Sequence, residues 1–215
     1  MNNKIIVNNC VIENLLPIKK NLKNKNKKFS AQGFYNDKKV KIYEVFDKNQ
    51  GALREFVSNH KELSTYFPKL IIYDKKFIVE EWLKGNTLTE IKPAFFSMIK
   101  YSFVIKKMIK QMWSVEYGQE VFDYIDYIYK RLGKTCNFDL SKIPIRINHN
   151  DLSLGNILKT SEGLKIIDNE FLGNSRGWIL NKKNSFLKES LQSNDFISEE
   201  QIKELWQIRK EWSSF

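Results

Sequence analysis

The chain has 215 residues, of which 42% are hydrophobic and 13% aromatic, and its formal net charge is +11 at pH 7. This composition excludes an intrinsically disordered chain, and the length suffices for one domain or two small lobes with a buried core. The longest apolar runs, such as 77–79 and 95–99, end at a Glu or a Lys long before the ~20 apolar residues that a membrane span needs.

The first 85 residues predict a small antiparallel sheet with one helix. Four segments combine β-branched or aromatic residues with turn residues at their ends, and one segment between them carries apolar residues at helical spacing. A turn at Asn36 and Asp37 joins the first two strands as a hairpin. The strands are expected at 30–35, 39–45, 69–73 and 76–81, and the helix at 49–63.

Helices are predicted for most of the remaining chain. Thr87 and Glu90 have the spacing of a capping box, which begins a short helix. Between 94 and 134, apolar residues recur every three and four positions, as two long helices require. Two further helices are expected near the carboxyl end, at 185–193 and 198–212, and Ser198 with Gln201 has the spacing that begins the second.

Polar residues gather at 145–168, between the predicted helices. This segment reads as a strand, a polar loop and a tight hairpin that ends at Asp168. The hairpin brings Asn156 and Asp168 to the same open end, where an amide oxygen and a carboxylate oxygen can share one hard cation. Asp151 lies in the loop that leads to this end, and a nearby cation keeps its carboxylate ionised and able to accept a proton from a hydroxyl. Phosphoryl transfer requires this set of groups.

Two motifs in this segment resemble the catalytic loop and the metal-binding segment of the protein-kinase-like superfamily. They are His-Asn-Asp-x-x-x-x-Asn at 149–156 and Ile-Asp-Asn-Glu at 167–170. They are most similar to the branch of aminoglycoside phosphotransferases, choline kinases and lipopolysaccharide sugar kinases, where Ile-Asp-x-Glu or Ile-Asp-x-Asp replaces Asp-Phe-Gly. The resemblance implies a two-lobed α+β fold, with a β-rich nucleotide-binding lobe at 1–85 and a reduced helical lobe at 86–215.

The resemblance also implies roles for the motif residues. Asp151 would be the catalytic base, and His149 would be a structural residue of the same loop. Asn156 and Asp168 would be the ligands of Mg²⁺. A chance surface loop is the alternative interpretation of the motif.

Binding of ATP would involve residues of the first lobe. Lys41 would contact the α- and β-phosphates and pair with Glu55 on the following helix. Two alternatives remain. Lys39, two positions earlier on the same strand face, could take this role, or Lys41 is an exposed strand lysine that does not bind ATP. The connector between the lobes, 80–83, would meet the adenine through Glu81, Trp82 and Leu83, with Trp82 beside it. A buried Trp at a strand end is the alternative.

One part of the family pattern is missing. No Gly-x-Gly-x-x-Gly occurs, and the lysine-rich segment 23–28 occupies the place of the loop that covers the phosphates. The lysine amines of this segment could bind the phosphates as point charges. The alternative is a flexible segment whose lysines are exposed to solvent.

The resemblance implies an ATP-dependent kinase with a hydroxyl acceptor. Only 47 residues follow Asp168, and they hold no Ala-Pro-Glu segment for docking peptides, so a small-molecule acceptor is expected. A sugar of a bacterial surface glycan or lipopolysaccharide, or a small alcohol such as choline, fits the resemblance. A small atypical protein kinase within a complex and a nucleotide-binding pseudokinase remain alternatives.

Charge and cysteine content bear on location and partners. Residues 1–10 lack the apolar stretch of a secretory signal, and Cys10 and Cys136 are too few for a disulfide framework, so a cytoplasmic protein is expected. No dedicated nucleic-acid site is expected, because no such motif accompanies the positive charge. Four lysines between 100 and 110 suggest a solvated helix face, or peripheral contact with an anionic membrane surface.

Overall fold

A computed structural model of the chain describes residues 3–18, 28–137, 139–176 and 198–214. Two predictions lie outside these residues. They are the lysine-rich segment, of which only Lys28 is described, and the helix expected at 185–193.

The largest sheet has six antiparallel strands in the order β1-β2-β3-β4-β6-β5. Both predicted hairpins are confirmed within it. Asn36 and Asp37 join β3 to β4 with φ values of 47° and 59°, the left-handed geometry of the tight turns that suit twisted strands. A further hairpin, β1 with β2, was not predicted. The strands are Ile5–Val7, Cys10–Pro17, Ser30–Tyr35, Lys38–Glu44, Leu70–Tyr73 and Phe77–Glu81 for β1 to β6.

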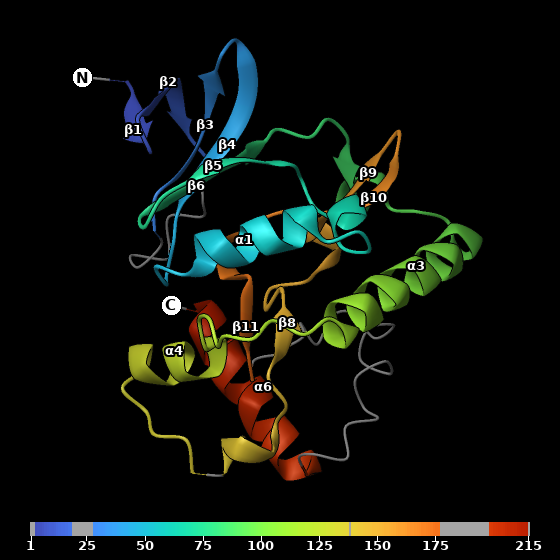
Figure 1. Cartoon of the computed structure of the whole chain (residues 1–215). Coiled ribbons are helices and arrows are strands. Elements are labelled where there is room, and N and C mark those ends of the chain that lie inside the picture. The colour runs from blue at the N-terminus through green and yellow to red at the C-terminus, as the bar shows by residue number, and fades with distance from the viewer. Residues whose placement is uncertain (1–2, 19–27, 138, 177–197, 215) are drawn as a thin grey trace.

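Helix α1, Gln50–Asn59, lies beneath this sheet (Figure 1). It is shorter than the predicted 49–63, because His60 has an extended backbone with ψ of 123°. A single 3₁₀ turn, Ser64–Tyr66, follows before β5. The apolar side chains of α1, Leu53 and Val57, are fully buried and join the large core beneath the sheet.

Of the two long helices predicted between 94 and 134, only the first is confirmed in length. Helix α3 has 20 residues, whereas α4 has only 8, because the backbone is extended at Val115 and α4 begins after its cap at Asp123. The capping box of Thr87 and Glu90 begins α2, and Ser198 and Gln201 exchange hydrogen bonds at the start of the last helix. None of the described helices is both long and apolar enough to cross a membrane. Their bounds are Leu88–Ile91 for α2, Phe95–Ser114 for α3, Tyr124–Arg131 for α4 and Glu199–Ser214 for α6.

Two small sheets connect the helical part to the polar segment. In one, β7 pairs with β9, which forms a hairpin with β10; in the other, β8 pairs with β11. The predicted hairpin is therefore confirmed. The bounds are Asn86–Thr87 for β7, Arg146–Asn148 for β8, Ile157–Thr160 for β9, Gly163–Ile166 for β10 and Gly173–Ser175 for β11, with 3₁₀ turns at Leu140–Lys142, Leu154–Asn156 and Asn169–Phe171.

The expected α+β class, an antiparallel sheet followed by a mainly helical part, is confirmed. The largest core cluster joins α1 to α3, α4 and α6, and a smaller cluster covers the outer face of the sheet. The core therefore includes residues from both sides of position 85, and the division into lobes at 1–85 and 86–215 stays a proposal.

Candidate active site

The loop after β8 is tied to the segment after β10 by two buried side chains. His149 Nε2 lies 2.9 Å from the carbonyl oxygen of Ile167, so this nitrogen carries the proton, and burial lowers the pKa of the ring. Asn150 Nδ2 donates to the carbonyl oxygen of Phe171 over 2.9 Å. A neutral His149 and Asn150 thus fix the position of Asp151, the next residue in the loop.

The hairpin places Asn156 and Asp168 at one end, as its sequence predicted. The Ile167 N–H donates to the Asn156 carbonyl oxygen over 2.9 Å and extends the ladder of β9 and β10 by one bond. Asp168 then adopts a left-handed backbone with φ of 64°. Asp and Asn tolerate this conformation better than other non-glycine residues, which explains a carboxylate at the sharp exit from the strand.

Asp151 is held from two sides. The Asn156 amide nitrogen donates to the Asp151 carbonyl oxygen over 2.7 Å and to its Oδ2 over 3.3 Å. Arg209, from the last helix, contacts Oδ1. No local pattern predicted this arginine, because it lies 58 residues further along the chain.

Lys41 reaches the same place from the large sheet. Its Nζ lies 2.5 Å from Asp168 Oδ1 and 3.7 Å from Glu170 Oε1. Burial alone lowers the pKa of Lys41, but the nearby carboxylates, led by Asp168, outweigh burial and raise this pKa. The alternative, Lys39, places its Nζ 4.1 Å above the Trp82 ring instead. Of the two lysines, Lys41 therefore contacts the predicted metal segment, residues 167–170.

The structure corrects the expected pairing of Lys41 with Glu55. Glu55 is exposed and accepts a hydrogen bond from the Tyr73 hydroxyl over 2.7 Å. An α-helix turns by about 100° per residue, so the neighbouring Arg54 faces inward instead. Arg54 binds Glu80 of β6, with Nη2 3.1 Å from Oε2 and both side chains 1% exposed.

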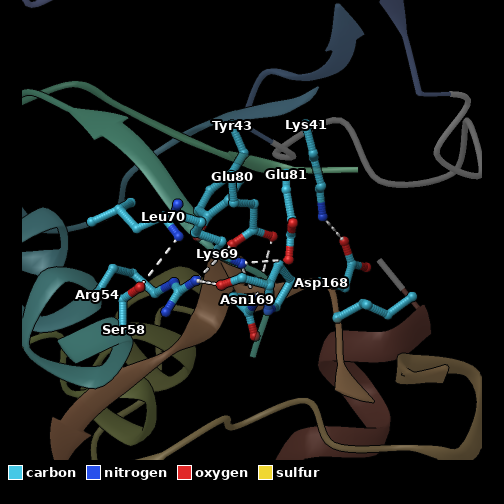
Figure 2. Close-up of polar contacts among 12 residues, drawn as sticks. Lys41, Tyr43, Arg54, Ser58, Lys69, Leu70, Glu80, Glu81, Asp168 and Asn169 are labelled. Carbon is cyan, nitrogen blue, oxygen red and sulfur yellow. Dashed lines mark hydrogen bonds and ion pairs between the residues drawn. The ribbon is translucent and has the colours of Figure 1, made fainter. Parts of the chain in front are cut away.

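The Arg54 and Glu80 pair supports the metal segment through Asn169 (Figure 2). Asn169 Nδ2 donates to both carboxylate oxygens of Glu80, over 3.3 and 3.2 Å. From the start of α1, Gln50 Nε2 donates to the carbonyl oxygens of Glu170 and Leu172, over 3.0 and 2.8 Å. Helix α1 therefore fixes the backbone on both sides of Phe171.

The buried pair gives a stability prediction. Arg54→Met is expected to lower the free energy of unfolding by about 3–5 kcal/mol, because it leaves the Glu80 charge buried without its main partner. Urea denaturation measures this loss. The double variant with Glu80→Met should lose less than the sum of the two single variants, while Lys130→Met, which breaks an exposed pair with Asp126, should barely move the urea midpoint. Additive losses would contradict the coupling.

Aromatic packing holds the other side of the metal segment. The Phe171 ring lies 5.0 Å from Phe46 and 5.2 Å from Tyr124, measured between ring centroids. Phe46 follows the end of β4, Tyr124 lies in α4, and the Trp212 ring of α6 contacts Tyr127, so the cluster joins the sheet and both helices to the site. Its members are Phe46, Phe122, Tyr124, Tyr127, Phe171 and Trp212.

Two backbone N–H groups of the connector already donate hydrogen bonds within the first lobe. The Glu81 N–H donates to the Lys69 carbonyl oxygen over 2.9 Å, and the Trp82 N–H donates to that of Lys39 over 3.2 Å. Trp82 is half-buried beneath the Lys39 ammonium group. Leu83 is the first residue beyond these hydrogen bonds. Of Glu81, Trp82 and Leu83, it is therefore the one whose backbone is the candidate for contact with the adenine.

The donor set at the hairpin end fits a hard cation. The amide nitrogen of Asn156 is bound to Asp151, so its amide oxygen is the atom that can coordinate, at the hairpin end that also carries Asp168. The described residues contain no cluster of three or more His, Cys, Asp or Glu side chains suited to a metal. A cation here would take its remaining ligands from phosphate oxygens and water, as Mg²⁺ commonly does.

A scan against protein-family models finds no match for this sequence, and neither does a search of curated protein sequences. Solved structures with a similar fold do exist. A thermostable mutant of aminoglycoside phosphotransferase APH(4)-Ia is 8% identical over 76% of this chain and 69% of its own, with a TM-score of 0.48. Another structure of that enzyme contains AMP-PNP and hygromycin B.

Two eukaryotic kinases are among the other similar structures. Ethanolamine kinase from Plasmodium vivax is 16% identical over 90% of this chain and 70% of its own, with a TM-score of 0.46. Choline kinase from Cryptosporidium parvum is 12% identical over 75% of this chain and 59% of its own, with a TM-score of 0.45. The names of these proteins match the branch that the motifs resemble. Because all these TM-scores are below 0.5, a function for this chain has to be argued from its own residues.

Proposed function

We propose that the chain is a Mg-ATP-dependent phosphotransferase that moves the γ-phosphoryl group to a hydroxyl of a small molecule. The observation that supports this most is the meeting of Lys41, Asp151, Asn156 and Asp168 at one end of a hairpin. A buried cation, two oxygen donors for a metal and a fixed carboxylate are the parts that phosphoryl transfer needs.

Each residue has a separate task in this proposal. Asp168 and Asn156 hold Mg²⁺, which supplies charge neutralisation at the phosphates. Lys41 binds phosphate oxygens, and Leu83, with Glu81 and Trp82 beside it, meets the adenine. Asp151 accepts the proton of the acceptor hydroxyl. The oxygen of that hydroxyl bonds to the γ-phosphorus while the bond between this phosphorus and the ADP oxygen breaks.

His149 has a positioning role in the same proposal. Its buried ring binds the Ile167 carbonyl oxygen, next to Asp168, and burial lowers its pKa. Burial disfavours the protonated ring, and Nε2 already donates its proton to a carbonyl oxygen, so His149 is a poor acceptor for the proton of the hydroxyl. Asp151 remains the base.

For the acceptor, we propose a sugar of a bacterial surface glycan or lipopolysaccharide, or a small alcohol such as choline, met in the cytoplasm. The test is transfer of labelled γ-phosphate from Mg-ATP to a panel of such hydroxyl compounds. Transfer without any protein substrate supports the proposal. Transfer that needs a partner protein would identify an atypical protein kinase, and Mg-ATP binding without any transfer would identify a pseudokinase.

Peripheral contact with an anionic membrane is proposed from the exposed face of α3. Phe96 and Phe103 are 83% and 68% exposed, although they are large apolar residues. Lys100 and Lys107 share their face at helical spacing, and residues 93–115 contain no acidic side chain. Aromatic and basic residues on one helix face are typical of helices that lie on anionic lipid surfaces.

Vesicle flotation tests this contact. We expect the protein to float with vesicles of phosphatidylglycerol and phosphatidylcholine, but not with phosphatidylcholine alone. Lys100→Glu with Lys107→Glu should lower binding by roughly tenfold or more, because each basic residue near the surface contributes about 1 kcal/mol. Lys130→Glu on α4 is the control for Lys100→Glu alone, which makes the same change in charge. Equal binding to both vesicle types would contradict the proposal.

A further inference from the structure

Arg209 brings a fixed positive charge to the candidate base from the carboxyl-terminal helix. Leu205, Ile208 and Trp212 of α6 are buried, so the helix has a set position on the core. The Arg209 guanidinium carbon lies 5.4 Å from the centre of the Tyr124 ring. The Arg209 side chain is 13% exposed where it contacts Asp151, which itself retains 30% exposure.

This arrangement determines the charge that an acceptor meets. Both carboxylate oxygens of Asp151 accept hydrogen bonds, Oδ1 from Arg209 and Oδ2 from Asn156. A hydroxyl that donates to Asp151 must therefore approach beside the guanidinium group. A positive group on the acceptor would be repelled there, whereas a phosphate or carboxylate can accept paired N–H bonds from the guanidinium.

The other carboxylates of the site do not favour a cationic acceptor either. Asp168 and Glu170 both contact Lys41, and Asp151 contacts Arg209. Two cations, Lys41 and Arg209, thus lie beside the three acidic side chains of the candidate site and offset most of their negative charge. Binding of a quaternary amine or an amino sugar by charge would require carboxylates that are not already compensated in this way.

We propose that Arg209 makes the site selective for an acceptor that carries a phosphate or a carboxylate close to the reacting hydroxyl. The inference rests on the proposed phosphotransferase function and narrows its acceptor class, because it favours a sugar that carries an anionic group over choline or another cationic alcohol. Arg209 would bind the anionic group while Asn156 continues to hold Asp151. Arg209 is thus a specificity residue, and Asp151 remains the group that takes the proton.

Side-chain NMR of arginine tests this directly, because the chain contains only five arginines. The protein, saturated with Mg-ADP, is titrated with glucose, glucose 6-phosphate, glucuronate and glucosamine. We expect both anionic sugars to shift the Arg209 Nε–H signal, which Arg209→Gln identifies by its loss. Their affinity should exceed that of glucose by about tenfold or more, as one charge-assisted pair allows, and glucosamine should bind most weakly. A response to only one anionic sugar would assign the group as phosphate or as carboxylate.

Arg209→Gln should remove the preference for anionic sugars. Arg209→Lys keeps the charge but not the paired donors, so it should weaken the preference several-fold and serves if the Gln variant does not fold. Lys134→Gln is the matched control, because it breaks the ion pair of Lys134 with Glu211 on the same helix, away from Asp151. No shift of the Arg209 signal, or equal binding of anionic and neutral sugars, would overturn the inference. A protein that does not bind Mg-ADP would instead refute the proposed function.

Discussion

Replacing Asp168 with Asn is expected to abolish the stabilisation of the protein by Mg-ATP. A ligand at a hundred times its dissociation constant adds about 2.7 kcal/mol to the free energy of unfolding. For a chain of this length, that should raise the Tm of the native protein by roughly 5–10 °C. The variant should show no such rise, because it lacks the carboxylate that would hold the metal.

Asn is the better replacement for this test, because Asp168 has a left-handed backbone with φ of 64°. Asn tolerates that conformation, whereas Ala would add strain and lower the Tm for an unrelated reason. The Tm is measured with ATP in the presence of magnesium and in the presence of a chelator. A rise that persists in Asp168→Asn, or that does not need magnesium in the native protein, would contradict the metal assignment.

Replacing Asp151 with Asn is expected to separate binding from transfer. The Mg-ATP-dependent rise in Tm should remain, because Asp151 is not assigned to the nucleotide or the metal. Transfer of the γ-phosphoryl group should fall by roughly 10² to 10⁴, the usual contribution of a general base. The rate is measured with an acceptor found in the panel, at saturating Mg-ATP.

Asp151→Asn also keeps the shape of the side chain and one oxygen that can accept from Arg209. A loss of transfer therefore reflects the missing base rather than a displaced helix. Full transfer by this variant would show that another group takes the proton. Loss of Mg-ATP binding would show that Asp151 belongs to the metal site.

Local patterns were sufficient to predict the hairpins, the caps and the hairpin end at which Asn156 and Asp168 lie. Asn36 with Asp37, Thr87 with Glu90, and Ser198 with Gln201 each act within four residues, so their geometry follows from the short-range chemistry of turns and helix ends. The amino-terminal hairpin was missed although its Asn8 and Asn9 have positive φ values of 46° and 65°. Its first strand has only three residues, too few for a clear alternation.

Contacts between distant segments could not be predicted in this way. The period of α1 is visible in the sequence, but which of the adjacent residues Arg54 and Glu55 faces inward depends on how the helix packs beneath the sheet. A buried Glu80 then makes Arg54 the inward residue, and Glu55 binds Tyr73 at the surface. Lys41 meets Asp168 across 127 residues, and Arg209 meets Asp151 across 58. Such pairs form only when the whole core has fixed both backbones, because the energy of each contact depends on burial and distance rather than on neighbours in the chain.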